Sequence, residues 1–168
     1  MDEPSQNPQG VASPGRASLA GIPFSSNPAF ATHRSLLDAI GERLASEVRV
    51  ALAAPPSRLR THCQTDFAIE AVYGLRDEYD SIWWLPGGCP AAVPGTFAEI
   101  AFPLDLPEAE SLEQEDMVAA VRKRLAPDRR CLFVFDNVTE PELLETLVPA
   151  ESAARVLLIT GQKQAPSN

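Results

Sequence analysis

The sequence predicts an α/β domain in which a parallel sheet of about four strands carries helices on both faces. Short, almost entirely apolar segments alternate with helical segments four times along the chain, and this order is typical of parallel sheets built from strand–helix units. The apolar segments contain few polar residues, which indicates burial on both sides. A chain of 168 residues is long enough for one such domain and its core without disulfides or metals.

Composition argues against several classes of protein. The net charge is −9 and the pI is about 4.7, and an acidic surface repels phosphate backbones, so general nucleic-acid binding is not expected. No stretch reaches the roughly 18 apolar residues of a membrane span, and the N-terminus has no signal-peptide pattern, so no membrane association is expected. The three cysteines, Cys63, Cys89 and Cys131, form no Cys-x-x-Cys pair, which favours reduced thiols in a cytoplasmic protein over a disulfide framework or zinc site.

Residues 1–23 are rich in Pro, Ser, Gly, Asn and Gln. Such a segment buries too little apolar surface to offset its ordering entropy, so we expect a disordered tail there. A linear binding motif in this tail is the alternative. The polar residues 164–168 are expected to be a frayed C-terminus.

The first half of the core is expected to contain two helices and two strands. Leu37, Ile40 and Leu44 recur at helical spacing, whereas the following run is short, apolar and β-branched. Trp83 and Trp84, adjacent in the second strand, are predicted to pack on opposite faces of the sheet rather than to form a stacking platform. The expected bounds are 35–45 for the first helix, 48–54 for the first strand, 66–75 for the second helix and 80–85 for the second strand.

The second half begins with a segment, residues 86–111, that five prolines interrupt. One or two helical turns are expected at residues 97–102. Ser111 is expected to cap a helix that has acidic residues in its first turn and basic residues in its last. The remaining elements are expected at 131–135 (strand), 140–147 (short helix with Pro141 near its first position) and 155–160 (strand).

Ligands of open parallel sheets bind beyond the carboxyl ends of the strands. Asp136 and Asn137 follow the apolar strand at 131–135, which is the Walker B pattern, where a carboxylate at the strand tip holds Mg²⁺ directly or through water. The alternative for Asp136 is an ordinary loop or helix-capping residue. The acidic run at 108–116 is interpreted as a helix start and solvated surface rather than a metal site.

Several segments resemble those of bacterial NB-ARC domains, the STAND class of P-loop NTPases, in order and spacing. They are Asn27-Pro28-x-Phe30, 78–84, 132–137, 140–149 and 155–160. The resemblance covers about residues 24–163 and implies an NB-ARC-like nucleotide-binding core there. It further implies a three-layer, P-loop NTPase-like sheet with strand order 1-4-3-2, and ATP or ADP with Mg²⁺ as a ligand that switches a signalling protein.

The phosphate loop departs from this family. Its pattern G-x-x-x-x-G-K-[ST] needs glycines to turn backbone N–H groups toward phosphates and lysine for charge. Residues 54–65 contain no glycine. Matched backward from the tryptophans, Gln64 takes the place of the lysine and donates only a neutral hydrogen bond, while Thr65 keeps the hydroxyl that meets Mg²⁺. Arg58 and Arg60 add positive charge nearby, as anion ligands or as solvated loop residues.

The resemblance therefore assigns nucleotide contacts, Mg²⁺ contacts and a sensor position to this chain. The nucleotide contacts would be Arg58, Arg60, Gln64, Thr65, Asp66 and Thr160, and the Mg²⁺ ligands Thr65 and Asp136. The family's sensor Thr-Ser-Arg is replaced by Thr160-Gly161-Gln162, so the arginine that senses the γ-phosphate is absent. No catalytic residue is assigned beyond the Walker B-like pair Asp136 and Asn137.

The segments that form the core resemble the family, whereas the residues that contact phosphate in the family are replaced. This combination predicts a regulatory, nucleotide-binding pseudo-NTPase with weak or no hydrolysis. The first alternative is an adaptor module that kept the fold, lost nucleotide binding, and binds a protein partner through its acidic surface or Pro-rich tail. The second is an active ATPase with an unusual loop. The identity of the partner and the oligomeric state remain open at this point.

Overall fold

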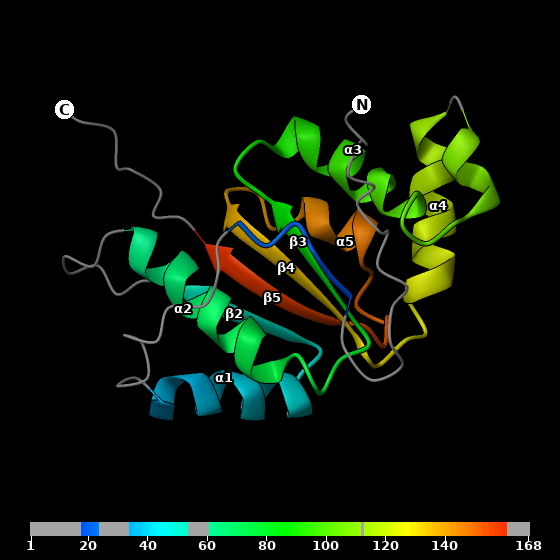
Figure 1. The fold of residues 1–168 in the computed structure, drawn as a ribbon. Coiled ribbons are helices and arrows are strands. Elements are labelled where there is room, and N and C mark those ends of the chain that lie inside the picture. The colour runs from blue at the N-terminus through cyan, green and yellow to red at the C-terminus, as the bar shows by residue number, and fades with distance from the viewer. Residues whose placement is uncertain (1–17, 24–33, 54–60, 112, 161–168) are drawn as a thin grey trace, which may run out of the picture.

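The computed structural model describes residues 18–23, 34–53, 61–111 and 113–160. Five strands form one sheet in the order β1-β3-β4-β5-β2, and every neighbouring pair is parallel (Figure 1). The four strands expected from the sequence have the expected relative order, 1-4-3-2, and the predicted fold class is confirmed. The strands are β1 (Ser18–Ala20), β2 (Arg49–Ala53), β3 (Ser81–Pro86), β4 (Cys131–Val138) and β5 (Arg155–Thr160).

The disordered tail was expected to reach residue 23, but residues 18–20 form the edge strand β1. Residues 18–20 pair in parallel with residues 81–83 of β3. Directly after β1, Gly21 has a φ of +77°, and a Cβ there would lie 2.5 Å from the backbone oxygen of Trp84. The pairing uses backbone groups, which composition does not reveal. Residues 1–17 and 164–168 lie outside the described residues.

Helices cover both faces of the sheet, as predicted (Figure 1). On one face lie α1 (Arg34–Ser46) and α2 (Thr61–Leu75). On the other lie α3 (Val93–Ala98), α4 (Gln114–Leu125) and α5 (Leu143–Leu147). Short 3-10 turns occupy Pro90–Ala92, Glu99–Ala101 and Pro107–Glu110.

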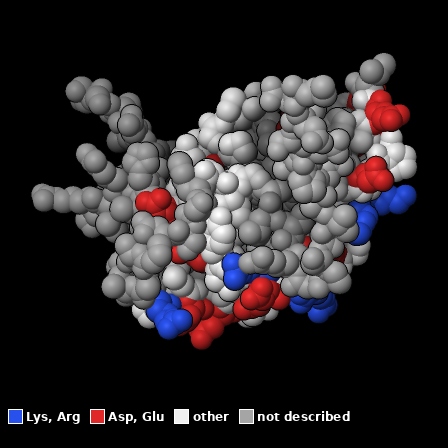
Figure 2. Space-filling model, viewed as in Figure 1, with Lys and Arg blue, Asp and Glu red and all other residues white. Residues whose placement is uncertain are grey.

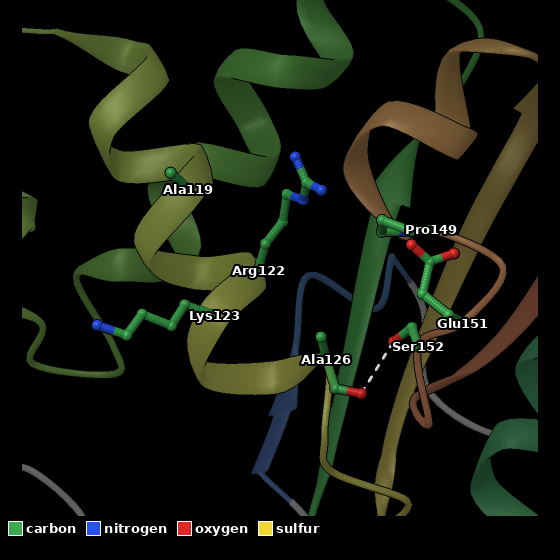
Figure 3. A pocket seen from close by; sticks show the side chains of 7 residues that line it. All are labelled: Ala119, Arg122, Lys123, Ala126, Pro149, Glu151 and Ser152. Atoms are coloured by element: carbon green, nitrogen blue, oxygen red, sulfur yellow. Dashed lines mark hydrogen bonds between the residues drawn. The ribbon is translucent and has the colours of Figure 1, made fainter.

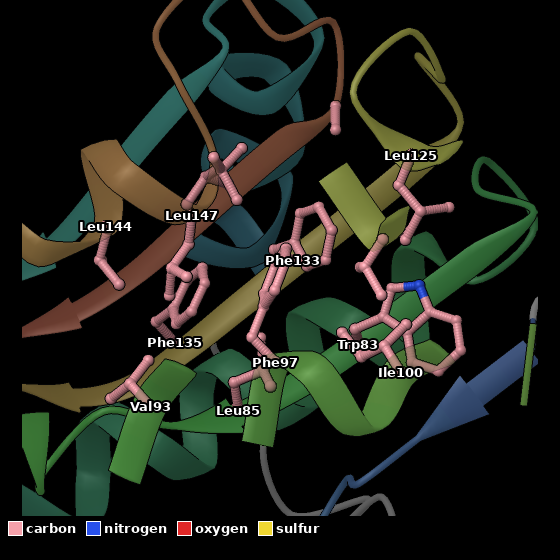
Figure 4. Packing of buried hydrophobic residues seen from close by; sticks show 14 of the residues in the cluster. Trp83, Leu85, Val93, Phe97, Ile100, Leu125, Phe133, Phe135, Leu144 and Leu147 are labelled. Atoms are coloured by element: carbon pink, nitrogen blue, oxygen red, sulfur yellow. The ribbon is translucent and has the colours of Figure 1, made fainter. Parts of the chain in front are cut away.

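Each face of the sheet has its own apolar cluster. Trp83 belongs to the cluster under α3, α4 and α5, and Trp84 to the cluster under α1 and α2. The prediction that the two tryptophans pack on opposite faces is therefore confirmed. On the Trp83 side, Phe133 packs near two other rings (Figure 4), and its ring centroid lies 5.4 Å from that of Phe97 and 6.3 Å from that of Phe135.

Two helix starts on the α4–α5 side differ from the expected positions. The helix expected to begin at Ser111 starts at Gln114. Ser111 instead accepts a hydrogen bond from the N–H of Glu113 and donates one to Asp116, at 3.2 and 3.0 Å. This local turn satisfies the hydroxyl without a helical cap. The short helix α5 begins at Leu143, so Pro141 lies before it rather than in its first turn.

The helix α2 begins at Thr61, five residues before the expected start at Asp66. No proline or glycine follows Pro56 until Gly74, so nothing in the local sequence interrupts a helix there. The second half of the segment interpreted as a phosphate loop is therefore helical. Its first part, residues 54–60, lies outside the described residues.

Candidate functional site

The structure brings together the two residues that the sequence assigned to Mg²⁺. Thr65 lies in the second turn of α2, and Asp136 lies near the carboxyl end of β4. The hydroxyl of Thr65 donates a hydrogen bond to Oδ1 of Asp136 at 3.0 Å, although 71 positions separate them in the chain. This contact lies at the edge of the sheet where open α/β folds bind ligands.

The carboxyl group of Asp136 is perturbed by its position. Partial burial raises its pKa above the usual value, and hydrogen bonds from Thr65 and from the backbone of Asn137 oppose that rise. No basic side chain in the described part of the chain contributes to this balance. A half-buried carboxylate without a counter-charge among the described residues gains from a cation that binds beside it.

A bulge orients the end of β4. The register between β4 and β5 shifts between Phe135 and Val138, and Asn137 adopts a φ of +58°. Bulges of this kind redirect side chains and occur often beside active sites. Asn137 is exposed, and its left-handed conformation is uncommon outside glycine.

The loop after β3 packs closely on this bulge. The N–H of Gly87 donates to the backbone oxygen of Asp136 at 2.6 Å. A Cβ on Gly87 would lie 2.9 Å from Val138, and one on Gly88 would lie 2.8 Å from the side-chain nitrogen of Asn137. Any residue other than glycine at position 87 or 88 would therefore force its neighbours to move. In the sequence, the pair Gly87-Gly88 directly after a strand is the signal that indicates this close approach.

Gln64 does not lie as expected for a replacement of the phosphate-binding lysine. Its side chain is 6% exposed, and its amide nitrogen donates to the backbone oxygen of Leu52 at 3.4 Å. Its amide oxygen is buried and has no hydrogen-bond partner among the residues that the structure describes. The helical position of residue 64 directs this side chain toward β2, which sequence matching alone could not show.

The other predicted nucleotide contacts are only partly described. Asp66 follows Thr65 in α2 and is partly exposed. Thr160 ends β5 and is in register with Ala53 of β2, so it lies at the same edge of the sheet as Asp136. Arg58 and Arg60 lie outside the described residues, as do residues 27–30 and 161–162.

The chemistry of this edge suits a metal ion that arrives with phosphates better than a resident one. Among the described residues, no group of three or more His, Cys, Asp or Glu side chains could hold a metal. One carboxylate and one hydroxyl match what proteins usually offer to Mg²⁺ when phosphates and waters complete its shell. The backbone N–H groups in the first turn of α2, at residues 61–63, precede the first intrahelical hydrogen bond and favour an anion.

Two depressions lie elsewhere on the surface. One, of about 370 Å³, lies between the end of α4 and the turn at 149–152 (Figure 3). The other, of about 610 Å³, runs between α1 and α2. On the face shown in Figure 2, acidic and basic side chains alternate along the lower rim. Neither depression is lined by Thr65 or Asp136.

No protein-family model matches the chain, and no curated protein is similar to it. Within the part of the chain that the structure describes, no helix has the length and apolar character needed to cross a membrane.

Proposed function

We propose that the chain is a cytoplasmic regulatory module of the NB-ARC class, which binds ADP or ATP weakly with Mg²⁺ and hydrolyses ATP slowly or not at all. The observation that carries this proposal is the hydrogen bond between Thr65 and Asp136 at the carboxyl edge of the sheet. In the resemblance, these two residues supply the hydroxyl and the carboxylate that meet Mg²⁺. The confirmed strand order is the one that the resemblance implies.

Each residue has a limited role in this proposal. Mg²⁺ would supply the positive charge that neutralises the phosphates. The carboxylate of Asp136 would hold the ion directly or through water, and Thr65 would orient that carboxylate through its hydroxyl. The N-terminus of α2 would favour the phosphates through the backbone N–H groups of its first turn.

Weak hydrolysis follows from what surrounds these two residues. Gln64 is buried against Leu52, and a neutral amide donor is weaker than an ammonium group toward phosphate. Among the described residues, no Lys or Arg perturbs the carboxyl group of Asp136. The described part of the site therefore offers little of the positive charge that stabilises a transferred phosphoryl group.

The test is a titration of the full chain with Mg²⁺–ADP and Mg²⁺–ATP by calorimetry. We expect weak, Mg²⁺-dependent affinity that Asp136→Asn abolishes and Thr65→Val reduces. The exposed Asp77 offers a charge-matched control, and Asp77→Asn should bind nucleotide as the unmodified chain does. Equal affinity in the Asp136 and Asp77 variants would refute the assignment. Turnover near ~1 s⁻¹ would instead indicate an active ATPase.

A protein-interaction module is the second candidate, and the groove between α1 and α2 favours it. Asp38, Glu42 and Glu78 line this groove and form no ion pair with other described residues. Gly41 and Gly74 also line it, and small residues let another helix approach closely. The groove therefore suits a basic amphipathic helix. Absence of nucleotide binding at millimolar concentration, together with binding of a Lys-rich helical peptide that Asp38→Asn weakens, would favour this candidate.

A further inference from the structure

The depression between α4 and the turn at 149–152 lies at the opposite edge of the sheet from Asp136. Ala126 follows α4 and precedes β4, and the turn precedes β5, so both lie at the amino ends of the strands. The volume of about 370 Å³ is near the lower end of the ~300–1,000 Å³ typical of small-molecule sites. Figure 3 shows its seven lining residues.

Hydrogen bonds tie the two walls of this depression together. The backbone oxygen of Ala126 accepts from the hydroxyl of Ser152 at 3.0 Å and from the N–H of Ala153 at 2.6 Å. The N–H of Ser152 donates to the oxygen of Pro149 at 2.9 Å, which closes the turn. Ser152 is only 6% exposed. The walls are therefore held in position before any ligand binds.

Opposite charges face each other across the depression without pairing. Arg122 extends from α4 toward the turn, and the carboxylate of Glu151 lies on the turn (Figure 3). Arg122 is partly buried, whereas Glu151 is exposed. Among the described residues, neither side chain forms a salt bridge within 4.0 Å, since all four ion pairs involve other residues.

The remaining wall is largely apolar. It consists of the side chains of Ala119, Ala126 and Pro149. Lys123 also lines the depression, and in Figure 3 its ammonium group points away from Glu151. The two basic residues exceed the one acidic residue, so a ligand with a carboxylate is favoured over a simple cation.

We propose that this depression binds a small zwitterion, namely a free α-amino acid with an apolar side chain. Its carboxylate would accept two parallel hydrogen bonds from the guanidinium of Arg122, the geometry for which arginine is suited. Its ammonium group would pair with Glu151, and its side chain would lie on Ala119, Ala126 and Pro149. A simple anion would pair only with Arg122, and a simple cation only with Glu151. This proposal does not depend on nucleotide binding at Asp136.

The test is calorimetric titration of the full chain with three related probes: L-leucine, N-acetyl-L-leucine and L-leucinamide. The second lacks the ammonium group and the third lacks the carboxylate. We expect saturable binding of leucine, and binding of each blocked compound that is about tenfold weaker or more, because each loses a charged hydrogen bond. Equal binding of leucine and a blocked compound would overturn the proposal, as would no binding of leucine at millimolar concentration.

Matched variants assign the binding to this depression. Glu151→Gln and Arg122→Gln should each weaken leucine binding about tenfold or more. Arg124→Gln on the same helix and Glu140→Gln, both at exposed positions, should leave it unchanged. Arg122 also lines a small cavity together with Phe97 and Leu125, so its variant is checked by thermal melting. Glu151 is exposed, and unchanged leucine affinity in its variant would by itself refute the site.

Discussion

The hydrogen bond from Thr65 to Asp136 predicts a measurable and pH-dependent contribution to stability. Thr65→Val removes the hydroxyl with little change in shape. A hydrogen bond to an ionised carboxylate contributes about 1.5–3 kcal/mol. Because Asp136 is partly exposed, water replaces part of the lost bond, so we expect the lower end, about 1.5 kcal/mol. For a domain of this size, that lowers Tm by roughly 3–6 °C.

The pH dependence identifies the bond as one to a charged group. The hydroxyl of Thr65 favours the ionised form of Asp136 and so lowers its pKa relative to a chain without the hydroxyl. The difference in unfolding free energy between the two proteins is therefore largest above the pKa that Asp136 has in the folded variant, which is the higher of the two. It decreases as pH falls from that pKa toward the lower pKa of the unmodified chain and the carboxylate becomes protonated.

The assay is urea denaturation of both proteins at several pH values, with Thr146→Val as the control. Thr146 is exposed, and its hydroxyl donates a hydrogen bond to the backbone oxygen of Leu143 in its own helix. The control should change stability by no more than about 0.5 kcal/mol. A loss in the Thr65 variant no larger than in the control, or a loss that is independent of pH, would refute the reasoning.

Three further predictions concern the charge of Asp136, two glycines and two cysteines. Burial raises the pKa of Asp136, so ionisation of this carboxyl group opposes folding above that pKa. Asp136→Asn should therefore raise Tm at neutral pH while nucleotide affinity is lost. A lower Tm would contradict this prediction. Gly87→Ala should lower the free energy of unfolding by about 1–3 kcal/mol, because the added Cβ would lie 2.9 Å from Val138 in β4. At Gly74 an added Cβ meets nothing within 4 Å, so Gly74→Ala should stabilise α2 by about 0.5–1 kcal/mol. Urea denaturation measures both changes. Burial raises the pKa of Cys131 to about 12, so thiol labelling at neutral pH should modify the exposed Cys89 and leave Cys131 unmodified until the chain unfolds.

Local pattern predicted most of the architecture. The apolar runs that became β2, β3, β4 and β5 are visible as strands because burial on both faces requires nearly every residue to be apolar. The neighbours Trp83 and Trp84 were predicted on opposite faces because side chains alternate along a strand. Their order in the sheet came from the resemblance to NB-ARC domains, and the structure confirms it.

Features that depend on backbone position were missed or misplaced. The strand β1 pairs through backbone groups, which a Pro- and Ser-rich composition conceals. The start of α2 was placed five residues late, and this shift decides that Gln64 lies under β2 rather than at the open edge. A helix changes side-chain direction by about 100° per residue, so the role of Gln64 depended on geometry that motif matching does not contain.

By itself, the sequence determined four of the five strands, the approximate positions of most helices, and that Asp136 lies near the carboxyl end of a buried strand, because these follow from burial and hydrogen bonding within a few turns of chain. Only the tertiary structure decided that Asp136 meets Thr65, 71 positions away, and that Arg122 and Glu151 face each other across one depression. Contacts of this kind depend on the register of the strands and the packing of the helices on them. Strand register and helix packing are set by the contacts of the whole core and not by the two residues that meet.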